Sequence, residues 1–131
     1  MDTTRSGTVD LLGACPTLAR SRNVRELLKK HFGEDRAKVA IGMMRAGRLD
    51  GGFGDEIHNF LSDAIQNEAK VVWDGAIPGS EFEFPVNVNA FGGIFFVWAM
   101  EYDPVGYFTS RDDAVSYIFG EWDGVHGKVC G

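Results

Sequence analysis

The chain has 131 residues, of which 44% are hydrophobic and 24% charged, as expected for one soluble globular domain. Its longest apolar run, IFFVWAM at 94–100, is far shorter than the roughly 20 residues that span a bilayer. No early segment has the apolar core of a signal peptide, so we expect a cytoplasmic protein with no membrane contact. Cys15 and Cys130 are too few for a disulfide framework and predict two reduced thiols, with a bridge between them as the alternative.

The net charge of −6 is unevenly distributed along the chain. Residues 1–65 carry ten Lys and Arg against nine Asp and Glu, whereas residues 66–131 carry three against ten. The stretch 20–48 alone has nine cations against three carboxylates. The chain is therefore basic early and acidic late, and this contrast is its strongest functional indication.

The first 20 residues show no periodicity and are rich in Thr, Ser and Gly, which predicts a flexible N-terminal arm. A helix is expected from Asn23, because Asn is a good N-cap and Glu26 can complete a capping box. Gly33 is expected to end this helix in the left-handed conformation. The apolar stripe of the helix has helical spacing and consists of Val24, Leu27, Leu28 and Phe32.

Two further helices are predicted at 35–46 and 55–68, each with an apolar face of period 3.6. The glycine-rich stretch between them, GRLDGGFG at 47–54, is predicted to be a loop. It does not match a phosphate-binding loop, because no strand precedes it and no Lys follows it.

The stretch GDEIHNF at 54–60 holds two carboxylates and a histidine and is a candidate acid–base or metal site. Helical geometry brings Asp55 near His58 but points Glu56 away from both. The H-E-x-x-H spacing of a zinc site is absent. Acidic residues are also expected in a first helical turn, so the pattern favours a helix start with an exposed histidine.

After residue 70 the period changes from 3.6 to 2. Residues 81–89 alternate apolar and polar side chains, and Pro85 indicates an edge strand or a bulge. Residues 94–102 are apolar on both faces, as in a central strand. DPVG at 103–106 has the composition of a β-turn, and a short third strand follows at 107–109.

Ser110 is expected to cap a last helix, with Asp113 as its third residue. The predicted fold class is α+β, with about three N-terminal helices, a three-stranded antiparallel β-meander and a C-terminal helix. Residues 21–124 are predicted to form a single domain, and residues 125–131 a short tail.

Acidic side chains in the second half of the chain predict a surface for a protein partner. Negative charge steers a basic partner, and aromatic residues anchor interfaces. Our leading hypothesis is a small non-enzymatic inhibitor or adaptor, encoded by a phage or other mobile element, that uses the strand at 81–89 and the DPVG turn. The candidate residues are Glu81, Glu83, Glu101, Tyr102, Asp103, Asp112, Asp113 and Trp122.

The basic helices at 20–48 support an alternative hypothesis, nucleic-acid binding, because clustered Lys and Arg attract phosphates. No known nucleic-acid-binding motif accompanies them. The candidate residues are Arg22, Arg25, Lys29, Arg36, Lys38 and Arg45.

A third hypothesis is a small enzyme that uses His58 or His31 with nearby carboxylates. No nucleophile motif accompanies either histidine. We therefore assign no catalytic residue, no metal ligand and no cofactor.

Overall fold

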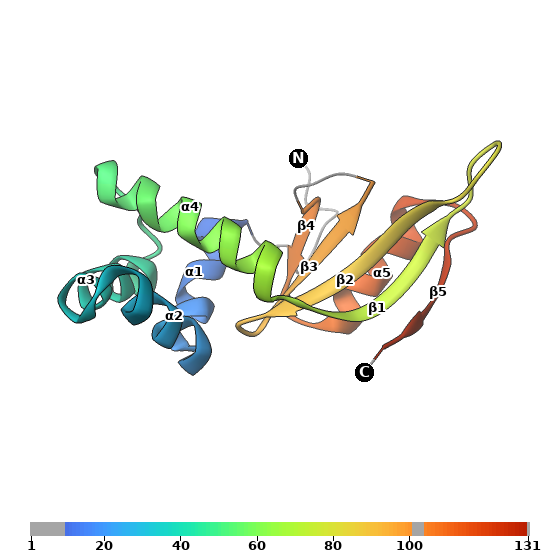
Figure 1. The fold of residues 1–131 in the computed structure, drawn as a ribbon. Coiled ribbons are helices and arrows are strands. Elements are labelled where there is room, and N and C mark those ends of the chain that lie inside the picture. Colours follow the sequence, from blue (N-terminus) through green and yellow to red (C-terminus); the bar gives the residue numbers. More distant parts are fainter. Residues whose placement is uncertain (1–9, 101–103, 131) are drawn as a thin grey trace. The chain divides into compact units, whose positions relative to one another are not determined.

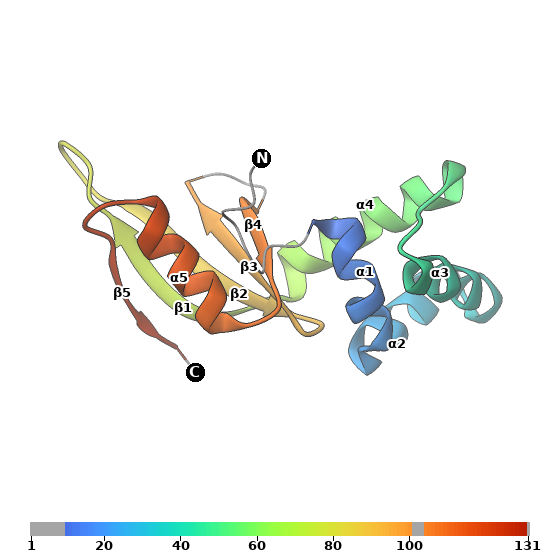
Figure 2. The ribbon, with the colours of Figure 1, turned by 180° about the vertical axis from the view of Figure 1, so that it is seen from behind.

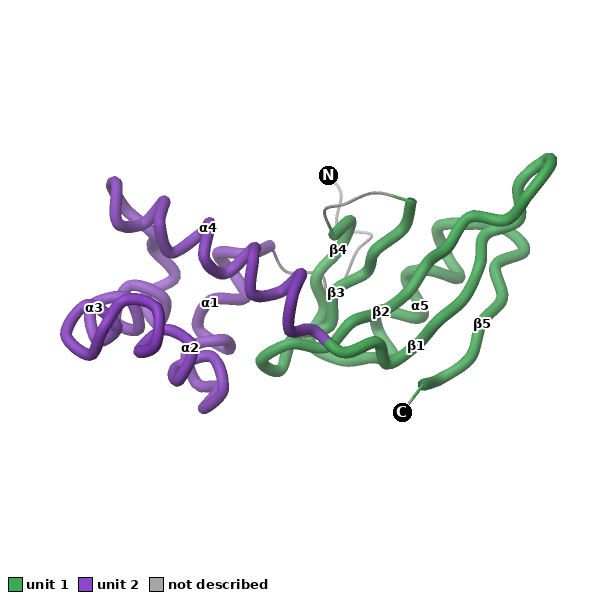
Figure 3. Tube along the Cα trace, viewed as in Figure 1, with its two compact units in different colours: residues 1–9, 70–131 green, residues 10–69 purple. Residues whose placement is uncertain are grey.

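A computed structural model describes residues 10–100 and 104–130 of the chain (Figure 1). The chain divides into two compact units (Figure 3). We call residues 10–69 the helical unit and the described residues from Lys70 onward the sheet unit. The single domain over 21–124 stays a prediction.

The helical unit contains α1 (Leu11–Arg20), α2 (Arg22–Phe32), α3 (Glu34–Ala46) and α4 (Gly51–Glu68). Helix α3 packs against both α1 and α2. The apolar faces of the helices meet in a core that excludes water, as the 3.6-residue periodicity requires. Fully buried core residues include Ala14, Leu18, Val24, Leu28, Ala40, Met44, Ile57 and Leu61.

The prediction of a flexible arm is wrong for residues 11–20, which form α1. The Asp10 side chain caps this helix and accepts a hydrogen bond from the Gly13 N–H at 2.6 Å. Cys15 and Leu18 are fully buried. Burial of this apolar face supplies the helical stability that a composition rich in Thr and Gly does not suggest.

The next two helices were predicted more closely. Helix α2 begins one residue before the predicted Asn23 cap, because the Ser21 hydroxyl accepts a hydrogen bond from the Val24 N–H at 3.3 Å. Gly33 ends α2 as the sequence predicted, but with φ 89° and ψ 165° its backbone is not in the predicted left-handed helical conformation. Helix α3 matches the predicted helix at 35–46 to within one residue.

The prediction of a loop at 47–54 is wrong for its second half, because α4 begins at Gly51. The Phe53 ring lies 5.3 Å from the Phe32 ring, and the Arg36 guanidinium lies 4.5 Å from the Phe53 ring. These contacts anchor the glycine-rich first turn. Asp55 and His58 therefore lie inside the helix, beyond its first turn.

The sheet unit contains β1 (Lys70–Ile77), β2 (Phe84–Phe91), β3 (Ile94–Ala99), β4 (Gly106–Phe108), α5 (Arg111–Glu121) and β5 (His126–Val129). The five strands form an antiparallel sheet of order β4-β3-β2-β1-β5. The predicted α+β class is confirmed. Strands β2, β3 and β4 correspond to the predicted meander, whereas β1 was not predicted and β5 occupies part of the predicted tail at 125–131.

The prediction that residues 81–89 form an edge strand is wrong, because β2 lies between β1 and β3. Pro85 is tolerated there because β2 begins to pair with β3 only at Val86, opposite Ala99. The missing N–H of proline therefore interrupts no bond between these two strands. An irregularity is present, but in β1, between Val71 and Trp73.

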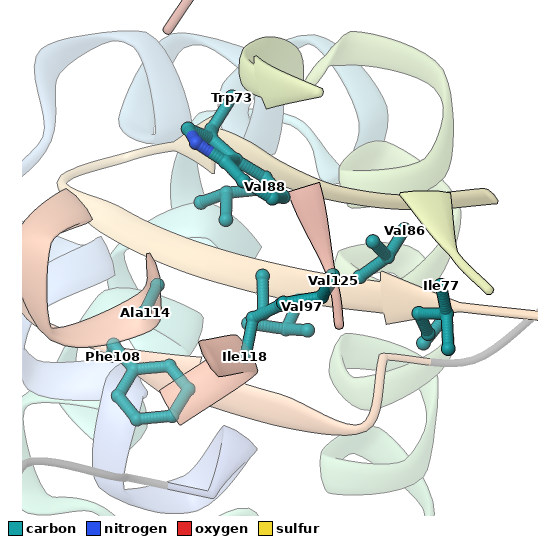
Figure 4. Packing of buried hydrophobic residues seen from close by; sticks show 10 residues of the cluster. Trp73, Ile77, Val86, Val88, Val97, Phe108, Ala114, Ile118 and Val125 are labelled. Atoms are coloured by element: carbon teal, nitrogen blue, oxygen red, sulfur yellow. The ribbon is translucent and has the colours of Figure 1, made fainter. Parts of the chain in front are cut away.

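Helix α5 crosses one face of the sheet (Figure 2). Ala114 and Ile118 on the helix are fully buried in a hydrophobic cluster with Val86, Val88 and Val97 of the sheet (Figure 4). The Ser110 hydroxyl accepts a hydrogen bond from the Asp113 N–H at 3.1 Å, so the predicted cap of this helix is confirmed. In the described part of the chain, no helix combines the length and apolar character needed to cross a bilayer.

The Trp73 indole requires glycine at two positions, Gly75 on its own strand β1 and Gly127 on the neighbouring β5. A Cβ at Gly127 of β5 would lie 2.5 Å from Trp73 Cζ2 and 2.6 Å from the Asp74 carbonyl oxygen. A Cβ at Gly75 would also lie 2.5 Å from the indole, at Cη2. Strand β5 can therefore pair with β1 only because Gly127 leaves room for the indole.

We predict that Gly127→Ala destabilises the sheet unit, because the new methyl group meets backbone and a buried indole. Overpacking of this kind costs about 1–3 kcal/mol of unfolding free energy. Urea unfolding followed by tryptophan fluorescence measures this loss of unfolding free energy, since Trp73, Trp98 and Trp122 all lie in the sheet unit.

Gly120→Ala is the matched control, because nothing lies within 4 Å of a Cβ at this position on α5. Alanine has the better helix propensity, so this variant should gain up to about 1 kcal/mol of unfolding free energy. Equal losses in the two variants would contradict the role assigned to Trp73.

Candidate functional site

Helices α2 and α3 bring four cations together around one cavity of about 400 Å³. On α2, Arg22, Arg25 and Lys29 follow one another at i, i+3 and i+7, so they share one face of the helix. On α3, Ile41 and Arg45 share a face at i, i+4. We call the cavity lined by Arg22, Arg25, Glu26, Lys29, Ile41 and Arg45 the basic cavity.

The charges around the basic cavity do not cancel. Glu26 is its one carboxylate, which leaves a net charge of +3 from four cations and one anion. Among the described residues, none of the four cations lies within ion-pair distance of a carboxylate. Arg25 is half-buried and the other three cations are exposed. The cavity can therefore accept the oxygen atoms of an anion without first breaking an internal ion pair.

Two cations outside the cavity are paired with carboxylates instead. Arg36 lies 3.2 Å from Glu56, and its guanidinium also stacks on Phe32 and Phe53. Arg48 pairs with Asp50 at 3.3 Å. These pairs are exposed, so each contributes little stability, but each reduces the charge that is available to a ligand.

The structure thus gathers four of the six basic residues proposed from sequence: Arg22, Arg25, Lys29 and Arg45. Arg36 is engaged by Glu56 and the aromatic rings, and Lys38 is exposed on α3 without lining the cavity. Sequence reasoning missed Glu26 and Ile41 as lining residues. Their helical spacing from Arg22 and Arg45, four residues in each case, is the signal that could have identified them.

The acidic candidate residues that the structure describes lie at separate places in the sheet unit. Glu101, Tyr102 and Asp103 lie outside the described residues. Asp103 is also the first residue of the predicted DPVG turn. Trp122 is half-buried and packs against the hydrophobic cluster of the sheet unit. The remaining residues are two pairs, Glu81 with Glu83 and Asp112 with Asp113.

These two pairs lie toward opposite ends of the sheet. Glu81 and Glu83 precede β2, whose first residue Phe84 pairs with Ile77 at the end of β1. Asp112 instead shares a surface depression with Val72, near the start of β1. Val72 and Ile77 are five positions apart along β1, which corresponds to roughly 16 Å. Each pair therefore presents its own local negative charge.

Neither proposed catalytic histidine belongs to a cluster of His, Cys, Asp or Glu side chains among the described residues. The His31 ring stacks on Phe60 and meets Phe32 edge-on, with centroid distances of 4.6 Å to both rings. His58 is exposed on α4. In residues 10–100 and 104–130, no group of three His, Cys, Asp or Glu side chains could hold a metal ion.

Both cysteines are free thiols. Burial raises the pKa of the Cys15 thiol to about 11, and the nearby negative charge of Asp10 adds to the shift. The thiolate is the reactive form, so Cys15 is inert near neutral pH.

We predict that a thiol reagent at pH 8 modifies Cys130 quickly and Cys15 slowly. A Cys130→Ser variant isolates the slow reaction, whose rate should rise about tenfold per pH unit until the pH approaches the Cys15 pKa. Rapid labelling of this variant at pH 8 in the folded state would contradict the assignment.

Comparisons with protein-family models, with curated proteins and with solved structures found no match to this chain. The basic cavity and the acidic groups of the sheet unit are therefore the features that bear on function.

Proposed function

We propose that the protein binds nucleic acid through the basic cavity between α2 and α3. The observation that carries this proposal is the cluster of four cations, none of which has an ion-pair partner among the described residues. Three of them are arginines, whose planar guanidinium groups match the oxygen atoms of a phosphate in bidentate geometry.

The cavity is also suitable in size and composition. A volume of about 400 Å³ accommodates a phosphate with part of its sugar, and Ile41 gives an apolar contact beside the cations. Sequence-independent contacts to phosphate need no motif that reads bases. The absence of a recognisable DNA- or RNA-binding motif is therefore compatible with this mode of binding.

The acidic half of the chain opposes long-range attraction of a polyanion. Residues 70–131 carry three cations and nine carboxylates, a net charge of −6. Salt screens such repulsion beyond about 8 Å at physiological ionic strength. Contacts inside the cavity are shorter than this, so local attraction governs binding once the phosphate has entered.

We predict weak, salt-dependent binding of the full chain to a fluorescently labelled DNA duplex, measured by anisotropy at several salt concentrations. If each of the four cations contacts one phosphate, the slope of log K against log salt should be about −3 to −4. Arg25→Gln should weaken binding and bring the slope closer to zero by about 1, because one contact is lost.

Lys38→Gln is the matched control, since it also removes one positive charge from an exposed helix but lies outside the basic cavity. It should leave the slope unchanged. Equal effects of Lys38→Gln and Arg25→Gln, or no binding at about 50 mM salt, would overturn the proposal.

A protein partner is the second candidate, and the inhibitor or adaptor role encoded by a mobile element belongs to it. The observation that favours it is Phe82, a large apolar side chain that is 63% exposed between two glutamates. Exposed aromatic residues with surrounding charge are typical anchors of protein interfaces. The cytoplasmic location expected from the sequence is part of both proposals.

A further inference from the structure

The connection between β1 and β2 presents an apolar ring between two carboxylates. Phe82 is the most exposed of the large hydrophobic residues in the described part of the chain. Its ring meets Phe84 edge-on, with the centroids 5.0 Å apart. Glu81 and Glu83 flank it and are also exposed. We call Glu81, Phe82 and Glu83 the acidic tip.

Contacts within the sheet unit hold the acidic tip in place. Glu83 Oε2 lies 2.7 Å from His126 Nε2, which links the tip to β5. Below the tip, a Cβ at Gly79 would lie 2.8 Å from the Phe84 ring, so the chain turns back tightly on itself. A surface that is already ordered loses less conformational entropy when it binds.

The acidic tip and the basic cavity are complementary. The tip offers one phenyl ring and the carboxylates of Glu81 and Glu83, the second of which already contacts His126. The cavity offers four cations and Ile41 beside one carboxylate, Glu26, which leaves it with a net positive charge. The volume of the cavity, about 400 Å³, exceeds that of a phenyl side chain. Opposite charges around an apolar anchor are the arrangement that gives specificity in protein interfaces.

We propose that the acidic tip of one molecule docks into the basic cavity of a second copy of this chain. Tip and cavity are different surfaces, so the contact is head-to-tail and builds rings or open chains instead of stopping at a symmetric dimer. A hairpin tip buries little area, so the contact is weak, with Kd between about 10 µM and 1 mM.

This self-association does not require the proposed function, but it uses the same cavity. If both proposals hold, nucleic acid and the acidic tip compete, and each weakens the other's binding. The experiment below contains no nucleic acid, so its outcome and that of the salt-dependence experiment are independent.

Sedimentation velocity of the nuclease-treated full chain tests the proposal at protein concentrations from about 10 µM to 1 mM. In about 50 mM salt, the average mass should rise with concentration above that of the 14.4 kDa monomer. In about 0.5 M salt the rise should shrink, because screening weakens attraction between charged surfaces. A monomer at every concentration in low salt would overturn the proposal.

Variants assign the contact to its two surfaces. Phe82→Ser removes the anchor and Arg25→Glu reverses a cavity charge, and each should give a monomer at every concentration. Leu12→Ser is the control, because Leu12 is a large apolar residue 45% exposed on α1, outside both the tip and the basic cavity. It should associate as the original chain does, and a loss equal to that of Phe82→Ser would overturn the assignment. Glu81→Lys tests the tip again should Phe82→Ser not fold.

Mixing the two defective variants gives the sharpest test. The Phe82→Ser molecule keeps its cavity and the Arg25→Glu molecule keeps its tip. A head-to-tail contact therefore predicts that the mixture forms one-to-one pairs and nothing larger. A mixture that stays monomeric, or that grows beyond pairs, would overturn the docking of tip into cavity.

Discussion

The sheet unit depends on the packing of one indole against two glycines. Trp73 lies across the backbone of Gly75 and Gly127, where a Cβ at either position would meet the ring at 2.5 Å. This packing fixes where β5 pairs with β1, with Ala76 opposite His126. His126 can then reach Glu83 and hold the hairpin connection between β1 and β2. A buried aromatic contact thus positions an exposed acidic surface.

In the helical unit, the decisive feature is that four cations without an ion-pair partner among the described residues lie around one cavity. Residues 10–69 carry nine cations and nine carboxylates, so the unit as a whole is neutral. Arg36 and Arg48 pair with Glu56 and Asp50, whereas the cations of the basic cavity have no such partner among the described residues. Local attraction for an anion therefore arises from the arrangement of charges and not from their total.

Much of the local structure could be predicted from the sequence, where side-chain period and capping chemistry agree. The helix at 35–46, the glycine stop at residue 33 and the Ser110 cap of α5 follow from interactions between residues close in sequence. The predictions were wrong where contacts between residues far apart in the sequence decide whether a segment is helical. Helix α1 is stabilised by burial of its apolar face, and the first turn of α4 is anchored by Phe32 and Arg36.

By itself, the sequence determined the α+β class, the segregation of basic and acidic residues and the spacing that places Arg22, Arg25 and Lys29 on one helix face. Only the tertiary structure decided that Arg45 of α3 joins them while Arg36 is engaged elsewhere, and that β2 is an inner strand. The physical reason is that periodicity specifies which way a side chain faces on its own element. Which element lies opposite, and so which charge is neutralised, depends on packing between residues far apart in the chain.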